Sequence, residues 1–109
     1  MKKKVIILGS TGSIGKTTFK IIKNSKFFFS IELLTTNKNT NLLLKQAKEL
    51  NVKKAVIFDN KKYNENKEIF KRNKIKLYNN FSEASKFIKK KVDISVCGIS
   101  GIAGLEHLL

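Results

Sequence analysis

The sequence has no proline and no tryptophan, and it contains a single cysteine, a single histidine and a single arginine. One cysteine excludes a disulfide within the chain and indicates a reducing cytoplasm. No apolar run approaches the roughly 20 residues that a membrane span needs, and the short apolar run after the N-terminal lysines lacks the features of a signal peptide. From these absences we expect a cytoplasmic protein with no membrane partner.

Acidic residues are also scarce: there are 8 against 23 basic residues, which gives a formal net charge of +15. Such a balance is typical of proteins that bind nucleic acid or anionic membranes. Yet the basic residues are almost all lysines spread along the chain, and the arginine forks and aromatic platforms of nucleic-acid sites are missing. We therefore interpret the lysines as a solvated surface and expect no nucleic-acid partner. A basic nucleic-acid-binding module and a non-enzymatic nucleotide-binding module stay open as alternatives.

Short apolar strands alternate with helical segments along the whole chain, so we expect one domain over residues 1–109. The predicted strands lie at 4–8, 30–35, 54–58, 74–78 and 93–97, and the predicted helices at 13–23, 41–50, 62–73 and 81–90. This alternation predicts an α/β, Rossmann-like fold: an open parallel sheet with helices on both faces. Right-handed crossovers give the strand order 4-3-2-1-5, with a ligand crevice where the order reverses, between strands 1 and 5.

Three glycines at a spacing of three follow the first strand and lead into the first helix. Gly9 allows a tight turn, Gly12 removes a Cβ where a pyrophosphate must approach, and Gly15 lets the helix lie close on the sheet. The free amides and the positive end of the helix dipole favour an anion at this point. The motif is not a Walker loop, because Ile14 stands where that motif needs glycine. We call residues 9–15 the glycine loop and predict that it binds the phosphates of a dinucleotide.

Two groups of apolar residues near the start of the chain are predicted to be structural. Ile14, Phe19 and Ile22 are predicted on the sheet-facing side of the first helix. The run Phe27–Phe29 is predicted to form a hydrophobic plug under the C-terminal end of that helix rather than an aromatic binding site.

The end of the second strand predicts which dinucleotide is bound. NAD-binding domains usually place Asp or Glu there to accept from the ribose 2′-hydroxyl, whereas this chain has Asn37, Lys38 and Asn39. A lysine would attract a 2′-phosphate and the flanking amides would donate to it, so we expect NADPH. A second glycine-rich turn, residues 98–104, follows the fifth strand and would flank the same crevice, which makes Gly101 a further candidate for cofactor binding.

At these residues the chain resembles the 1-deoxy-D-xylulose 5-phosphate reductoisomerase family, the NADPH enzymes of the non-mevalonate isoprenoid pathway. The resemblance rests on residues 7–15, on Asn37–Asn39, on Val92-Asp93 and on the glycine-containing segment 101–105. It implies cofactor contacts at Thr11, Gly12, Ser13 and Ile14, and at Asn37, Lys38 and Asn39. The family usually has Gly at the Asn37 position, and Asn tolerates a positive φ there better than most residues.

The resemblance also implies a larger enzyme that converts 1-deoxy-D-xylulose 5-phosphate to 2-C-methyl-D-erythritol 4-phosphate. Such an enzyme would bind a sugar-phosphate substrate and Mg or Mn, and it would form a homodimer. In this chain no cluster of His, Cys, Asp and Glu could hold a metal, and His107 is interpreted as a bystander. We therefore assign no catalytic and no metal-binding residue. The chain is expected to be a fragment, an NADPH-binding domain that is incomplete at its C-terminus, lacks the catalytic domain and is inactive by itself.

Other NADP-linked oxidoreductases remain alternatives, such as a semialdehyde dehydrogenase or an extended short-chain reductase. The latter would need a Tyr-x-x-x-Lys pair. Lys67 follows Tyr63 at that interval, but within a polar segment that we expect at the periphery.

Overall fold

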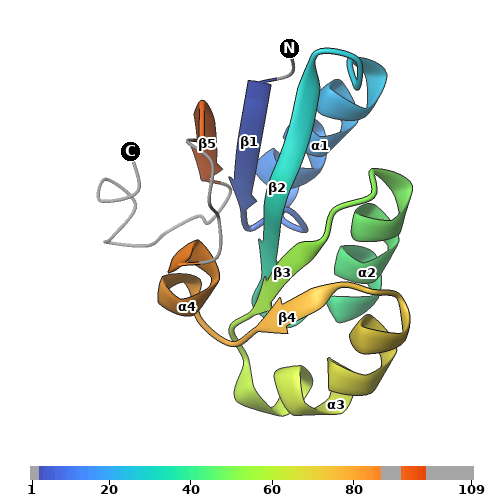
Figure 1. The fold of residues 1–109 in the computed structure, drawn as a ribbon, viewed down its shortest axis with the longest axis vertical. Helices are drawn as coiled ribbons and strands as arrows, with labels where there is room; N and C mark the ends of the chain where they lie inside the picture. Colours follow the sequence, from blue (N-terminus) through green and yellow to red (C-terminus); the bar gives the residue numbers. More distant parts are fainter. Residues whose placement is uncertain (1–2, 87–91, 98–109) are drawn as a thin grey trace.

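The computed structural model describes residues 3–86 and 92–97. Its five strands form one parallel sheet in the order β4-β3-β2-β1-β5 (Figure 1), as the alternation of strands and helices predicts. The elements in chain order are β1 Lys3–Leu8, α1 Ser13–Asn24, β2 Phe29–Thr36, α2 Thr40–Glu49, β3 Lys54–Ile57, α3 Asn60–Arg72, β4 Lys76–Tyr78, α4 Phe81–Lys86 and β5 Ile94–Cys97. Within the described residues, no helix is both long and apolar enough to cross a membrane.

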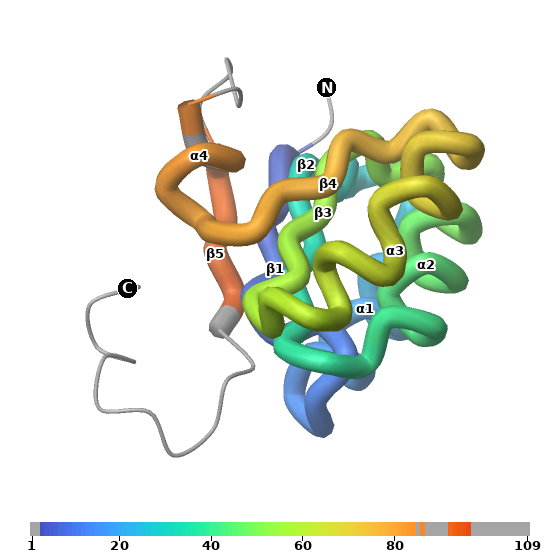
Figure 2. The backbone as a smooth tube through the Cα atoms, turned by 90° about the horizontal axis from the view of Figure 1, so that it is seen from below, coloured from blue at the N-terminus to red at the C-terminus, as the bar shows by residue number. Residues whose placement is uncertain are grey.

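Helices cover both faces of the sheet, but unequally. Figure 2 shows α1, α2 and α3 together on one face and α4 on the other. The larger core lies under the three helices and includes Phe19, Leu43 and Phe70, whereas a smaller cluster with Ala84 lies under α4. Three right-handed crossovers in one direction place three helices on one face, and the return from β4 to β5 places the next helix on the opposite face.

The first strand lies where the strand order reverses. β1 pairs with β2 on one side and with β5 on the other, all in parallel. Its residues alternate between the two cores, with Val5 and Ile7 facing the three helices and Ile6 and Leu8 facing α4. The glycine loop therefore leaves the sheet at its switch point, where open α/β sheets bind their ligands.

Two predictions about apolar side chains are wrong. Phe19 and Ile22 are buried as predicted, but Ile14 is 56% exposed. Phe27 and Phe28 do not form a plug, because their side chains are 80% and 68% exposed. Only Phe29 of that run is half-buried and packs against the larger core.

Candidate functional site

The glycine loop begins with a turn that only glycine adopts readily. Gly9 has φ of 75°, in the left-handed region. The amide of Gly12 donates to the carbonyl of Gly9 at 3.0 Å and closes the turn. Gly12 itself has φ of −80° and ψ of 178°, an extended backbone that other residues adopt without strain.

The loop presents an uncapped helix N-terminus. Gly12 is the N-cap of α1, so no side chain bonds the first amides, and the first turn has no acidic residue. The amide of Lys16 donates to the carbonyl of Gly12 at 2.8 Å, whereas Ser13, Ile14 and Gly15 come before the first amide that can find a helical carbonyl. These unpaired amides and the helix dipole suit a phosphate group.

Gly15 brings α1 into direct contact with the loop. A Cβ placed at Gly15 would lie 2.6 Å from Cα of Ser10 and would also clash with the carbonyl oxygen of Gly9. The sequence predicts that Gly15 lets the helix lie close on the sheet. The structure shows a close approach at Gly15, but to the backbone of the loop itself.

Buried polar residues hold the inner half of the loop, and sequence reasoning missed them. Thr35 at the end of β2 accepts from the amide of Gly9 through Oγ1 at 2.7 Å, and its carbonyl accepts from the amide of Ser10 at 2.9 Å. Gln46 of α2 bonds Ser10 twice, at 2.7 Å and 2.9 Å. A signal for Gln46 exists in the sequence, because it stands on the apolar face of its helix between Leu43 and Ala47.

The outer half of the loop faces solvent. Thr11 and Gly12 are half-buried, and Ser13 and Ile14 are exposed. The Thr11 hydroxyl lies 2.6 Å from the hydroxyl of Thr36, which links the loop to the end of β2. The four residues predicted to contact a cofactor are thus the accessible ones, and the exposure of Ile14 is what such a contact requires.

The Asn37–Asn39 segment lies beside the glycine loop, because β1 and β2 are parallel neighbours whose carboxyl ends meet at one edge. All three residues are exposed. The side chain of Asn39 caps α2 by accepting from the amide of Leu42 at 3.4 Å. Lys38 forms no ion pair with any residue that the structure describes. Asn37 does not use a positive φ, so the turn needs no glycine-like backbone at this position.

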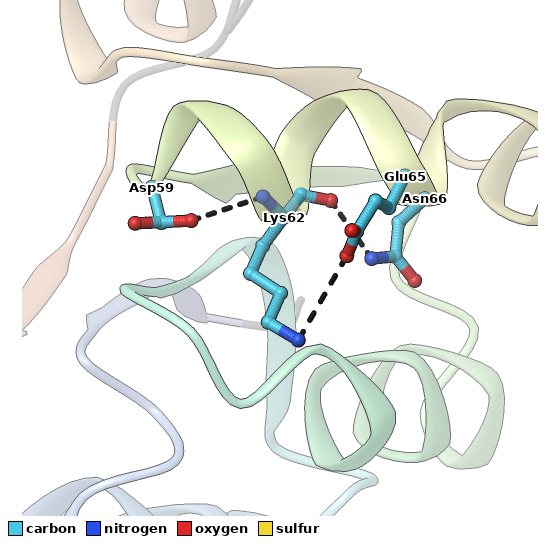
Figure 3. A network of polar contacts seen from close by, with 4 residues as sticks. All are labelled: Asp59, Lys62, Glu65 and Asn66. Carbon is cyan, nitrogen blue, oxygen red and sulfur yellow. Dashed lines mark hydrogen bonds and ion pairs between the residues drawn. The ribbon is translucent and has the colours of Figure 1, made fainter.

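A carboxylate that follows the next strand, β3, also reaches this edge, where the sequence analysis placed no acid. The amide of Asp59 donates to the carbonyl of Asn37 at 3.2 Å. Its carboxylate caps α3 by accepting from the amide of Lys62 at 3.0 Å, and Lys62 Nζ lies 3.8 Å from Glu65 (Figure 3). The carboxylate is therefore directed at the first turn of α3, where the helix dipole favours its charge.

Other candidate groups do not join this site. A cavity of about 280 Å³, lined by residues such as Ile22, Phe29 and Leu50, lies at the opposite end of the sheet, near the start of β2. Lys67 Nζ lies over the ring of Tyr63, 5.5 Å from its centroid, and both residues belong to α3. The described residues contain no group of three or more His, Cys, Asp or Glu side chains that could hold a metal. The predicted residue Gly101 and its turn lie outside the described residues.

Comparisons with known proteins agree with this geometry. The chain is 44% identical over 109 residues to the 1-deoxy-D-xylulose 5-phosphate reductoisomerase of Pelagibacter ubique, and 42% identical over 103 residues to that of a Thermoanaerobacter species. These alignments cover 98% and 94% of this chain but only 28% and 27% of the relatives. The chain thus spans little more than a quarter of their length.

Solved structures give the same result. The reductoisomerase from Zymomonas mobilis in complex with NADPH is similar with a TM-score of 0.67 and 35% identity, covering 72% of this chain and 21% of that one. A second structure, of a reductoisomerase with NADPH, fosmidomycin and magnesium, has a TM-score of 0.77 over 89% of this chain and 24% of its own. At 24% identity that likeness concerns the fold alone. A model of the family also matches residues 5–109, and the chain belongs to the 1-deoxy-D-xylulose 5-phosphate reductoisomerase family.

Proposed function

We propose that this chain is the NADPH-binding part of an enzyme that converts 1-deoxy-D-xylulose 5-phosphate to 2-C-methyl-D-erythritol 4-phosphate. The observation that carries the proposal is the uncapped N-terminus of α1 at the switch point of the sheet. The relative from Zymomonas mobilis, solved with NADPH, supports it. When bound, NADPH would supply the hydride, and this chain would bind and orient it.

The glycine loop would hold the pyrophosphate. Gly9 and Gly15 shape the loop, and the amides of Ser13 and Ile14 offer hydrogen-bond donors that the helix does not use. Thr11 adds a hydroxyl at the accessible side, and Gly12 leaves room because it has no side chain. The exposed Ile14 side chain offers an apolar contact that would exclude water from the bound cofactor.

The Asn37–Asn39 segment would select NADPH over NADH. Lys38 is exposed beside the glycine loop and would attract the 2′-phosphate, with the amides of Asn37 and Asn39 as donors. The Asn39 oxygen caps α2, which directs this oxygen at the helix and leaves the NH₂ group to donate to a ligand. Gly101 stays a proposed cofactor contact by resemblance alone.

The full enzyme would need more than this chain supplies. A relative has been solved with fosmidomycin and magnesium, but the described residues of this chain hold no metal-binding group, so we assign no step to a metal here. We also propose that the 109 residues alone bind cofactor without turnover. A cytoplasmic location and a homodimeric complete enzyme remain proposals that rest on the family.

Cofactor choice tests the proposal directly. In fluorescence titrations of the 109-residue chain, NADPH should bind more tightly than NADH by about 1.5–3 kcal/mol, which is roughly ten- to hundredfold. Lys38→Ala should remove most of this preference by weakening NADPH alone. Lys71→Ala, which removes an exposed lysine from α3, is the matched control and should leave the preference unchanged.

Two results would contradict the assignment. Equal affinities of the parent chain for NADPH and NADH would remove Lys38 from the site. An equal loss in Lys38→Ala and Lys71→Ala would mean that the general charge of the chain, and not a local site, attracts the 2′-phosphate.

A further inference from the structure

Gln46 is an unusual residue for its place in the fold. It lies in the middle of α2, on the face that packs against the sheet, and only 3% of it is exposed. Burying an amide is unfavourable unless its donor and acceptor are both satisfied. Leucine would serve helix packing at such a position, so the amide needs another explanation.

Both ends of the Gln46 amide bond one residue of the glycine loop. Ser10 Oγ donates to Gln46 Oε1 at 2.7 Å, and Gln46 Nε2 donates to the carbonyl of Ser10 at 2.9 Å. Ser10 is fully buried, and its amide donates to the carbonyl of Thr35. The backbone of α1 also contacts Ser10. At Gly15 it approaches the Ser10 backbone so closely that a Cβ would not fit. The Ser10 backbone is therefore held by β2, α1 and α2 together.

The bond to the Ser10 carbonyl fixes a neighbouring amide. The carbonyl of Ser10 and the N–H of Thr11 belong to one trans peptide unit and point in opposite directions. With the carbonyl directed at α2, the Thr11 N–H is directed away from α2. A flip of this peptide would turn a carbonyl oxygen, in place of the Thr11 N–H, to the side away from α2. A carbonyl oxygen repels phosphate.

We propose that Gln46 is a positioning residue that holds the Ser10–Thr11 peptide in the orientation that binds dinucleotide phosphate. The inference rests on the proposed function, since it assigns Gln46 a part in the same site. Gln46 does not touch the cofactor and acts through Ser10. It also ties the glycine loop to α2, the helix that begins directly after the Asn37–Asn39 segment.

Gln46→Glu provides a switchable test. A protonated glutamic acid can donate to the Ser10 carbonyl as the amide does, but a carboxylate cannot and repels it. Burial and this carbonyl should raise the pKa of the new acid above its ordinary value. The charged groups that line the groove beside residue 46 are Lys16, Lys20, Lys23, Lys45 and Glu49. Lys23 lowers the pKa of Glu49 below its ordinary value of 4.5, so Glu49 is ionised at both pH 5.5 and pH 8.

The experiment measures binding of NADP⁺, which is stable in acid, to the 109-residue chain by calorimetry. The affinity of each variant is divided by that of the parent at the same pH, which cancels the titration of the 2′-phosphate. Gln46→Glu should bind about tenfold more weakly than the parent at pH 8 and should recover to within about threefold at pH 5.5. Gln46→Met, which matches the size but cannot bond at any pH, should be weaker at both. Circular dichroism at each pH tests whether each variant is folded.

The outcomes separate this inference from the proposed function. If the parent does not bind NADP⁺, the proposed function fails. If the parent binds NADP⁺ and both variants bind it as tightly as the parent at each pH, Gln46 is not a positioning residue. A loss in Gln46→Glu that does not change with pH would mean that the residue is only a packing element, and would overturn the inference. Should Gln46→Met not fold, the pH series of Gln46→Glu still decides, because it compares one variant with itself.

Discussion

Gly12 and Gly15 are both glycines of one loop, yet the fold requires glycine at only one of the two positions. Gly15 faces backbone atoms of Gly9 and Ser10 that cannot move aside. Gly12 has an ordinary extended backbone, so the fold itself does not require glycine there. The fold therefore explains the glycine at position 15, whereas the glycine at position 12 is explained only by the proposed contact with a ligand.

Substitutions should separate these two demands. Gly15→Ala should lower the free energy of unfolding by about 1–3 kcal/mol or more, because the added methyl meets backbone. Gly12→Val should keep most of the stability but abolish dinucleotide binding, because a branched side chain occupies the pyrophosphate position. Urea unfolding measures the first effect and calorimetry the second. Parent-like binding by Gly12→Val would show that the phosphate lies elsewhere, and parent-like stability of Gly15→Ala would contradict the close contact.

Residue-level predictions succeeded where periodicity constrains a side chain and were wrong where it does not. The buried stripe of α1 is Gly15, Phe19 and Ile22, at helical spacing, and Ile14 stands about 100° away from Gly15 around the helix. Counting apolar residues alone placed Ile14 on the sheet because a glycine does not register as part of an apolar face. Phe27 and Phe28 lie in a loop, where no repeat predicts burial.

At the scale of elements, an irregularity in β2 sets which residues meet the glycine loop. The pairing of β1 with β2 shifts between Val5 and Ile6, so that Glu32 is an extra residue in β2. Ile31 and Leu34 then face one core and Leu33 the other. The shift also displaces the following threonines by one position, and both bond the glycine loop, Thr35 at Gly9 and Thr36 at Thr11. The run Ile31 to Leu34 has no regular alternation, so the sequence could not locate this bulge.

The helices α1 and α2, which carry the two parts of the candidate site, are joined at their C-terminal ends by one ion pair. Lys23 Nζ lies 2.6 Å from a carboxylate oxygen of Glu49. The hydrogen bond from Lys23 is the main cause that lowers the pKa of Glu49 from its ordinary value of 4.5, with Lys45 adding a smaller effect. A carboxylate with a lowered pKa stabilises the fold above its unfolded pKa, and this contribution is lost as the pH falls through the folded pKa.

Glu49→Gln should therefore be slightly less stable than the parent at pH 7, and the difference should be smaller at pH 3, because the contribution of the pair is lost as the pH falls through the folded pKa of Glu49. The effect at pH 7 should be small, because the pair is partly exposed and solvent screens it. Urea unfolding at both pH values measures this difference. Glu65→Gln, which removes the partner of Lys62 within α3, is the control for losing one negative charge. A difference for Glu49→Gln that is undiminished at pH 3 would point to packing rather than to charge.

At the scale of the whole molecule, the sequence was sufficient to predict the topology. Five apolar strands separated by helices, with right-handed crossovers, allow few arrangements, and the order β4-β3-β2-β1-β5 is confirmed. The glycine loop and the Asn37–Asn39 segment meet at one edge because parallel neighbours end together. Asp59 and Gln46 could not be placed in the same way. Their partners, Asn37 and Ser10, are distant in sequence, and only the packed structure brings them together.

The whole-molecule prediction concerns catalysis. A divalent metal that binds sugar oxygens needs several carboxylates that converge on one point. The acidic side chains of the chain are Glu32, Glu49, Asp59, Glu65, Glu68, Glu83, Asp93 and Glu106. Among the described residues none belongs to a group that could hold a metal. Asp93 lies at the start of β5, where it bonds the amide of Lys4, at the end of the sheet opposite the glycine loop.

The 109 residues should therefore not reduce 1-deoxy-D-xylulose 5-phosphate, although they should bind NADPH. The assay supplies the chain with NADPH, magnesium or manganese, and this substrate, and follows the absorbance of the reduced nicotinamide. A complete enzyme of the family is the positive control, and Gly12→Val is the background, because it should not bind cofactor. Turnover above that background would contradict this prediction, because the chain, alone or as an assembly of copies, would then complete a catalytic site without a carboxylate cluster among its described residues.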